Sequence, residues 1–231
     1  MSNIFQKSKK ALDKLSIIPN IAFANIYFSQ TGEDIILKEI FYNKKIGFYV
    51  DIGAHHPKRF SNTYLLYKKG WSGINIDADK RSIDLFNEER TRDKNIHCAI
   101  SNKEQKLNFY TFLDGAINTL DKKEANSWSK ARNEKPKVKK LKTKRLETIL
   151  DQNLPKDTPI DFFSIDIEGY DLEALKSNNW KKYSPNYILI EMFGSPFKSK
   201  KNKQKNAFLE KQGYELIAKT TITSVYKKIS I

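Results

Sequence analysis

Short apolar runs alternate with helical patterns along most of the chain, and this alternation restricts the fold more than any other feature. The runs "FYVDIG", "GINID", "FFSIDIEG" and "NYILIEM" predict buried strands, while "RSIDLFNEER" and "DLEALKS" predict amphipathic helices. Strands that alternate with helices favour a parallel sheet. The last two runs, "YELIAKT" and "SVYKKIS", have almost nothing between them, which forces an antiparallel pair.

The remaining stretches are less regular. "NIHCAIS" predicts one further strand, and "LNFYTF" predicts a more exposed one. Residues 115–136 are polar and irregular, and we expect them to form a loop that covers the substrate, with Asn118 and Trp128 in it. The lysine-rich runs "KPKVKKLKTKR" and "KSKKNKQK" predict solvated faces or mobile loops.

A chain of 231 residues suits one buried core, which we place in residues 45–231. We expect residues 1–44 to form a helical segment that packs on or flanks this domain. Two apolar stripes indicate helices in this segment. The first lies opposite lysines and consists of Ile4, Phe5, Leu12 and Leu15. The second belongs to a helix that begins at Gly32 and consists of Ile35, Ile36, Ile40 and Phe41. The first stripe suits either packing on the domain or peripheral contact with an anionic membrane surface.

Cysteine content and charge bound the location and the partners. The single cysteine, Cys98, excludes an internal disulfide and favours a cytoplasmic location. The basic N-terminus leaves open a peripheral location at the inner face of the membrane. The formal charge of +15 invites a nucleic-acid interpretation, but most basic residues are lysines, whereas phosphate and base recognition favours arginine. We therefore expect no nucleic-acid partner, and anionic substrates or lipids stay open.

Acidic or small residues stand where the predicted strands end. Ligands of an open parallel sheet bind beyond the carboxyl ends of its strands. The candidates at those ends are Asp51, Gly53, Asp77, Asp79, Ser101, Asp166, Glu168 and Glu191. So many carboxylates would be unusual in a scaffold without a ligand.

The turn after the first strand argues against a dinucleotide. A pyrophosphate would need further glycines there, but His55 and Lys58 occupy those positions. Asp51 would repel a phosphate and attract a cation such as a sulfonium, and Asp77 is placed to accept both hydroxyls of a ribose. A cation joined to a ribose suggests S-adenosylmethionine.

Five motifs resemble, in the same order, those of the FkbM-type S-adenosylmethionine-dependent methyltransferases: "SQTGEDIIL", "VDIGAHHPKRFSNT", "GINIDAD", "AIS" and "SIDIEGYDLEAL". The resemblance covers about residues 28–193. It implies an α/β class I methyltransferase fold, which is Rossmann-like, with a seven-stranded, mostly parallel sheet, one antiparallel strand and helices on both faces. It also implies O-methylation of sugars in glycans and natural products.

The resemblance further implies which residues bind the cofactor. Asp51, Gly53 and Ala54 would line its methionine end, and Asp77 with Ala78 its ribose. Further candidates, for several of which helix or turn capping is an equal explanation, are Gln30, Asp34, Ser61, Asn62, Ser101 and Asp166. The chain departs from the family where His55, His56 and Pro57 replace an asparagine and a glycine of many members.

The catalytic base stays open between several groups. His55 and His56 lie beside the predicted methyl group, and each has a role in shaping the turn as its alternative. Asp166 and Glu168, with Glu191 on the next strand, could act as a base or bind Mg²⁺, or could serve separately in cofactor contact and capping.

The sequence therefore predicts a methyltransferase that acts on a sugar hydroxyl in glycan, lipopolysaccharide, capsule or natural-product biosynthesis. The acceptor would be a sugar or glycan, either lipid-linked or anionic. RNA methylation is one alternative, and a non-catalytic Rossmann-like binding module is another. A nicotinamide-dependent oxidoreductase is disfavoured by the missing glycines.

Overall fold

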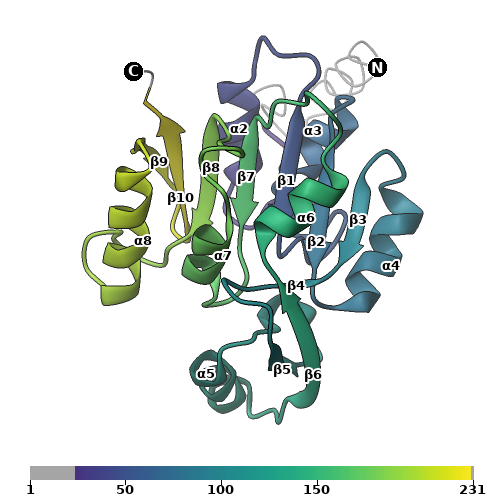
Figure 1. Ribbon diagram of the computed structural model, residues 1–231, viewed down its shortest axis with the longest axis vertical. Helices are drawn as coiled ribbons and strands as arrows, with labels where there is room; N and C mark the ends of the chain where they lie inside the picture. Colours follow the sequence, from purple (N-terminus) through teal and green to yellow (C-terminus); the bar gives the residue numbers. More distant parts are fainter. Residues whose placement is uncertain (1–23, 230–231) are drawn as a thin grey trace, which may run out of the picture.

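The computed structural model describes residues 24–229, so the predicted stripe from Ile4 to Leu15 lies outside the described residues. Figure 1 shows a large sheet flanked by helices and a small sheet set off at one end. In spatial order, the large sheet contains β3 (Lys94–His97), β2 (Ser72–Asp77), β1 (Phe48–Ile52), β7 (Phe162–Ile165), β8 (Tyr187–Glu191), β10 (Thr223–Lys228) and β9 (Tyr214–Lys219).

One strand of the large sheet is reversed. β10 runs antiparallel to both β8 and β9, and the other pairs are parallel. The predicted seven-stranded sheet with one antiparallel strand is thus confirmed. Strand order reverses at β1, which pairs with β2 on one side and β7 on the other. A ligand is expected outside the carboxyl ends of the strands at this point.

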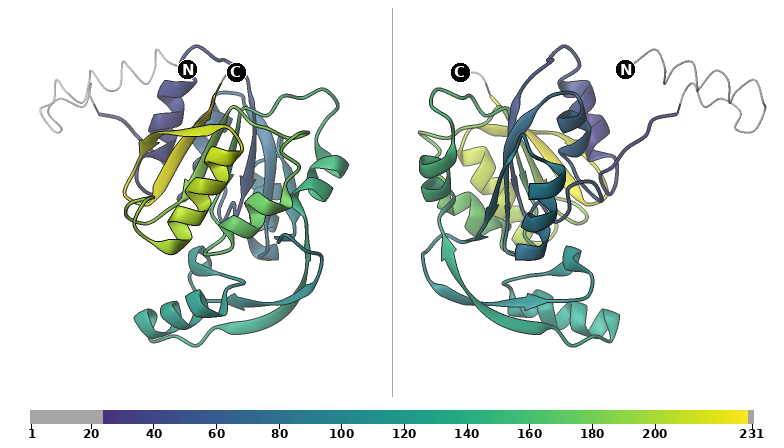
Figure 2. Two further views of the ribbon diagram at one scale, coloured as in Figure 1. Left: turned by 60° about the vertical axis from the view of Figure 1, so that its left-hand side comes forward. Right: turned by 90° about the vertical axis from the view of Figure 1, so that its right-hand side faces the viewer.

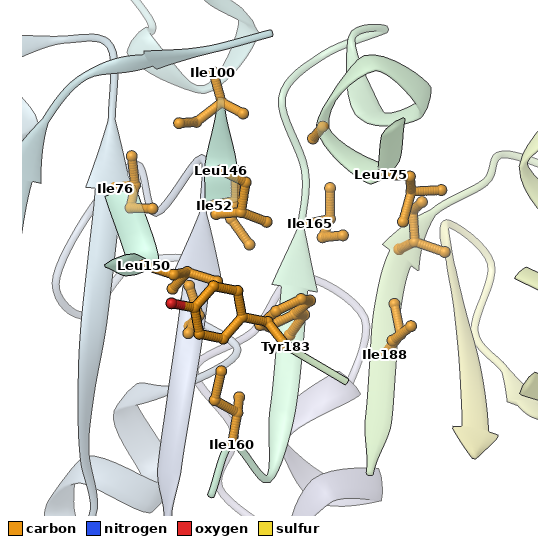
Figure 3. Packing of buried hydrophobic residues seen from close by; sticks show 14 of the residues in the cluster. Ile52, Ile76, Ile100, Leu146, Leu150, Ile160, Ile165, Leu175, Tyr183 and Ile188 are labelled. Atoms are coloured by element: carbon orange, nitrogen blue, oxygen red, sulfur yellow. The ribbon is translucent and has the colours of Figure 1, made fainter. Parts of the chain in front are cut away.

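Helices cover both faces of the large sheet, as predicted. They are α2 (Glu33–Ile40), α3 (Tyr64–Lys68), α4 (Lys80–Glu89), α6 (Leu146–Asn153), α7 (Asp171–Ser177) and α8 (Lys200–Lys211). Because successive strand residues point to opposite faces, Tyr49 packs with α2 and α3, whereas Val50 packs with α6 and α7. Figure 3 shows the cluster that contains Val50, in which Ile52 and Ile165 of the sheet pack with Leu146 and Leu175 of the helices.

The buried stripe of α2 differs from the predicted one. Leu37 and Phe41 are buried, while Ile36 and Ile40 are half-buried at its margin. The helix is rotated about its axis relative to the predicted orientation, because Glu33 and Asp34 of its first turn are buried as well. Asp34 accepts hydrogen bonds from the Phe28 amide (2.7 Å) and the Ser29 hydroxyl (2.7 Å), and so holds the preceding segment.

The small sheet contains β4 (Ala99–Ile100), β6 (Lys137–Lys144) and β5 (Lys106–Thr111), with α5 (Lys122–Arg132) beside it. Figure 2 shows this unit projecting from one end of the main sheet. "NIHCAIS" was expected to be one strand, but it contributes β3 to the large sheet and β4 to the small one. The chain passes from one sheet to the other at Cys98.

The predicted loop over residues 115–136 contains regular elements instead. Residues 115–136 contain the short 3₁₀ helix η2 (Gly115–Ile117) and α5, which Asp121 caps by accepting from the Lys123 amide (2.8 Å). Ala125 and Trp128 of α5 join a small core, which the sparse apolar residues concealed. The two lysine-rich runs are mostly solvated, as one of the two predicted alternatives had it, but they are regular elements rather than loops, since one forms β6 and the other begins α8. Backbone pairing with β5 fixes β6 even though its lysines stay in solvent.

A fully buried ion pair joins the turn after β1 to the sheet. Arg90 is 0% exposed and donates to Asp93 (2.9 Å), to the Tyr49 hydroxyl (2.6 Å) and to the Pro57 carbonyl (2.9 Å). Asp93 in turn accepts from the Gly73 amide (2.9 Å). β1, β2 and the intervening turn therefore share one charged centre. Within residues 24–229, no helix has the length and apolar character needed to cross a bilayer.

Arg90→Met should lower the free energy of unfolding by about 3 to 5 kcal/mol, because it leaves the Asp93 carboxylate buried without its cation. Urea denaturation at neutral pH measures this change. Lys80→Met is the matched control, since Lys80 forms only an exposed ion pair with Asp84, and its effect should stay below about 1 kcal/mol. Equal losses in the two variants would contradict the assignment.

Candidate active site

The strand ends of the large sheet open into three cavities that share lining residues. The narrow cleft, of about 50 Å³, lies over the ends of β1, β2 and β4. The middle cavity, of about 280 Å³, lies over β1, β7 and β8. The outer cavity, of about 660 Å³, continues from it between α5 and α8. Glu168 lines all three.

The narrow cleft joins apolar walls to one buried carboxylate. Ala78, Ala99 and Ile100 line it together with Asp77. Asp77 accepts hydrogen bonds from the amides of His55 (2.8 Å) and Asp79 (2.6 Å), and burial raises its pKa to about 6. Residues 115–120 fill much of the space, and a volume of this size holds little more than water.

The turn after β1 approaches β7 closely. Gly53 has φ +83°, and a Cβ there would lie 1.7 Å from the Asp166 carbonyl oxygen, so only glycine fits. Beside it, buried Asp51 accepts from the Thr63 hydroxyl (3.2 Å), and burial raises the pKa of Asp51 to about 6. Ala54 is buried in the same turn and, like Gly53, lines the middle cavity.

His55 lies between the narrow cleft and the middle cavity and lines both. Neither ring nitrogen has a hydrogen-bond partner among the described residues, and both are buried. Burial, reinforced by the nearby Arg59 guanidinium, lowers the pKa of His55 to about 4. The imidazole is therefore neutral at neutral pH, with a ring nitrogen unpaired among the described residues, and it is a weaker base than an ordinary histidine.

Other predicted site residues have structural partners. His56 Nδ1 accepts from the amides of Lys58 and Arg59 (both 3.0 Å), which shapes the turn. The Ser61 hydroxyl accepts from the amide of Tyr64, the first residue of α3 (3.1 Å), and so fixes the turn before the helix. Asp34 holds the segment before α2, as described above, and neither it nor Ser101 lines a cavity described here.

Two predicted cofactor residues do reach the middle cavity. Gln30 lines it, and so does Asn62, whose side-chain amide donates to the Ser164 hydroxyl (3.1 Å). Ser164 lies in β7 opposite Asp51 of β1. These side chains therefore surround the Asp51 end of the cavity.

Asp166, Glu168 and Glu191 converge on the middle cavity. One carboxylate oxygen of each lies within 4.8 Å of the other two. Burial raises the pKa of all three side chains, and nearby carboxylates raise them further: Asp171 acts on Asp166, and Asp166 acts on both Glu168 and Glu191. Glu168 has φ +47°, and its position is held by the Thr119 hydroxyl, which donates to its carbonyl (2.7 Å).

Several lining residues were missed in the sequence. Arg59, Phe60 and Arg132 line the middle cavity. Arg59 and Phe60 belong to the motif "VDIGAHHPKRFSNT", so their place in the chain was a usable signal. Arg132 gave none, because its segment was expected to be a loop. Lys205 was assigned to a solvated run, but it is buried and contacts Asp171 (3.1 Å).

Comparison with known sequences identifies the family. Residues 51–216 match the methyltransferase FkbM domain. The chain belongs to the FkbM methyltransferase family. It is thus an S-adenosylmethionine-dependent methyltransferase, and the resemblance of its motifs is confirmed. The match spans every strand end that lines the three cavities.

Solved structures of methyltransferases are similar to this FkbM methyltransferase in outline. A TehB-like S-adenosylmethionine-dependent methyltransferase from Corynebacterium glutamicum is 12% identical, with a TM-score of 0.44 over 99% of this chain and 98% of that one. The 1,6-didemethyltoxoflavin-N1-methyltransferase from Burkholderia thailandensis is 9% identical, with a TM-score of 0.43 over 99% and 89%. No curated protein gives a significant match.

The residues at the strand ends of this FkbM methyltransferase fit the cofactor chemically. The close approach at Gly53 leaves backbone rather than a side chain beside the cavity. Asp51 and Asp77 would supply carboxylates to a cationic ligand that carries hydroxyls. The donor set therefore agrees with S-adenosylmethionine.

Stability of this FkbM methyltransferase should depend on pH through His55. The folded pKa of about 4 lies below the ordinary value of 6.5, so the unfolded chain binds more protons between these values and stability falls as pH falls through this window. The variant His55→Asn has no imidazole at position 55, so it does not lose stability through this group as pH falls. Between pH 7 and pH 4 it should gain about 3 kcal/mol relative to the wild type, from about 1.4 kcal/mol per pKa unit.

Urea denaturation of both proteins at several pH values gives this difference directly. Asn suits the positive φ of position 55, so its backbone cost is small. The comparison with the variant removes the opposite trend expected from Asp51 and Asp77, whose raised pKa values stabilise the fold at lower pH. A pH-independent difference between the two proteins would contradict a buried neutral imidazole.

Proposed function

We propose that this FkbM methyltransferase O-methylates a hydroxyl of a sugar, in a glycan or a natural product. One observation carries the proposal. A buried, neutral imidazole without a hydrogen-bond partner, His55, lies at the boundary between the narrow cleft and the middle cavity. An alcohol is a weak acid, so its methylation needs a group that removes the proton, and His55 is such a group.

The narrow cleft is the proposed site of the adenosine, with Asp77 accepting from the ribose hydroxyls. Asp51, Gly53 and Ala54 then border the methionine end, where Asn62 and Gln30 line the same cavity. This arrangement puts the reacting methyl near His55. Adenine would require residues 115–120 to move outward, since the cleft is too small for a ring system as it stands.

When bound, S-adenosylmethionine supplies a methyl carbon whose bond to sulfur breaks, with its electron pair, as the acceptor oxygen bonds to that carbon. His55 accepts the hydroxyl proton on a ring nitrogen and later releases it to solvent. Asp51 and Asp77 fix the geometry of the donor by holding its two ends. The chain thus contributes alignment and one proton transfer.

The middle cavity offers an acceptor sugar aromatic surface and two arginines on one side and a group of carboxylates on the other. Phe60, Trp128 and Phe193 supply aromatic surface, on which the C–H face of a sugar ring can pack. Arg132 lines the same cavity, as does Arg59, whose guanidinium is paired with Asp114 (3.2 Å). A phosphate or carboxylate of an anionic acceptor would pair with Arg132 and would compete with Asp114 for Arg59. Its volume of about 280 Å³ suits one ring rather than a long polymer segment.

The activity test is incubation with labelled methyl donor and three acceptor classes: nucleotide sugars, lipid-linked or surface glycans, and RNA. We expect label in a sugar ether. His55→Asn should lower kcat by about 10²- to 10⁴-fold while the affinity for S-adenosylhomocysteine stays within about twofold, because a base acts only on the proton. Label in RNA alone would contradict the sugar assignment.

His56→Asn is the matched comparison for that variant. Its ring accepts only turn hydrogen bonds, which an asparagine oxygen can also accept, so kcat should change by less than about tenfold. A large loss in this variant with none in His55→Asn would move the base to His56.

Asp77→Ala should weaken S-adenosylhomocysteine binding by about 1 to 3 kcal/mol, because the ribose loses its charged acceptor. Calorimetric titration measures this change, and a thermal unfolding curve separates it from loss of the turn amides that Asp77 also binds. Asp84→Ala, on the exposed side of α4, is the control with the same charge change. Unchanged binding in Asp77→Ala would place the ribose elsewhere.

A further inference from the structure

Three carboxylates meet at the ends of two neighbouring strands. Asp166 directly follows β7, and Glu191 is the last residue of β8. Because Ile165 is in register with Ile190, these two side chains leave adjacent strands at the same level. Glu168 turns back toward them through its positive φ, and the three ligand atoms come within 4.8 Å of one another. Strained backbone at such a point is typical of a functional site.

Two of these side chains have carboxylate oxygens that lack partners among the described residues. Asp166 Oδ1 is buried and has no hydrogen-bond partner in the described part of the chain. Glu191 is only 8% exposed, and its carboxylate forms no hydrogen bond or salt bridge with residues 24–229. An uncompensated buried carboxylate is costly. These atoms therefore point to a ligand that the polypeptide does not supply.

The nearest basic side chain is engaged elsewhere. The ammonium of Lys205 donates to the Asp171 carboxylate (3.1 Å) and to the main-chain carbonyl of Glu191. Trp128 Nε1 donates to Glu168 (3.3 Å), but it carries no charge. Among the described residues, no cation forms an ion pair with any of the three carboxylates.

We propose that Asp166, Glu168 and Glu191 bind one divalent cation of the Mg²⁺ or Mn²⁺ class. An all-oxygen ligand set selects hard cations over zinc or copper. Three protein ligands leave further coordination positions open, and all three residues line the middle cavity, so those positions face the acceptor. The site resembles a catalytic rather than a closed structural centre.

The cation also defines the acceptor, and this step rests on the proposed function. The open positions suit two neighbouring oxygens of one sugar, such as a vicinal diol. Coordination would lower the pKa of a bound hydroxyl, whose proton His55 would accept. A monohydric acceptor of similar size would bind through one oxygen only and would react more slowly.

The test uses the full-length chain, stripped with chelator and without methyl donor. Free Mn²⁺ is measured by electron paramagnetic resonance during titration, and thermal unfolding is followed with Mg²⁺ or Mn²⁺ added. We expect one Mn²⁺ per chain and a rise in Tm. Glu191→Gln and Glu168→Gln should weaken Mn²⁺ binding by about tenfold or more, while Glu88→Gln, an equal charge change on the exposed side of α4, should not.

Two outcomes would overturn the cation site. One is the absence of Mn²⁺ binding to the folded wild-type protein, which would mean that the carboxylates share protons instead. The other is loss of S-adenosylhomocysteine binding in metal-free Glu191→Gln with unchanged Mn²⁺ binding, which would assign the cluster to the ammonium of the cofactor. The titration of the wild-type protein shows whether the folded chain binds Mn²⁺, even if a variant fails to fold.

The same titrations separate this inference from the proposed function. If S-adenosylhomocysteine binds and Mn²⁺ does not, the methyltransferase stands without a metal. If Mn²⁺ binds and no sugar is methylated with or without it, the cation site stands and the acceptor class is wrong.

Discussion

The buried Arg90 guanidinium holds together the part of the structure on which the site depends. It contacts Tyr49 of β1, the carbonyl of Pro57 in the turn and Asp93, which in turn binds β2. The turn between β1 and α3 carries Gly53 and His55, so its position sets the distance between the narrow cleft and the middle cavity. Removal of one charge from such a pair leaves the other buried and uncompensated, which strongly destabilises the fold.

The carboxylates at the strand ends are both buried and close to one another, and each of these conditions is unfavourable for a charged group. A parallel sheet brings the residues that follow its strands to one edge, and here these residues are acidic. Asp51, Asp77 and the three-carboxylate cluster each lose solvation on burial. Folding places them close together in spite of that cost. A cationic donor of methyl groups and a divalent metal would each offset part of it, at different ends of the same rim.

The sequence predicts the main sheet well because each strand is a local apolar run with a clear period. The reversed strand followed from the short link between "YELIAKT" and "SVYKKIS". Elements whose stability comes from distant partners were missed. β6 is held by pairing with β5, α5 by a small separate core, and Lys205 by an aspartate on another helix. The local sequence of such a segment does not show which distant residues it will contact.

The site was predictable in outline but not in its details. Strand-end position indicated Asp51, Asp77 and the carboxylates, since topology alone brings strand ends together. The difference between His55 and His56 depends on which ring points into the turn, and adjacent residues of one turn look alike in a sequence. Residues 115–120 are tied across the cleft by Asn118 to Asp79 and by Thr119 to Glu168. Outward movement of that segment would release the backbone of Glu168 from Thr119, so entry of the nucleoside at its proposed site would also shift a proposed metal ligand. The two ligands would then bind in a fixed order.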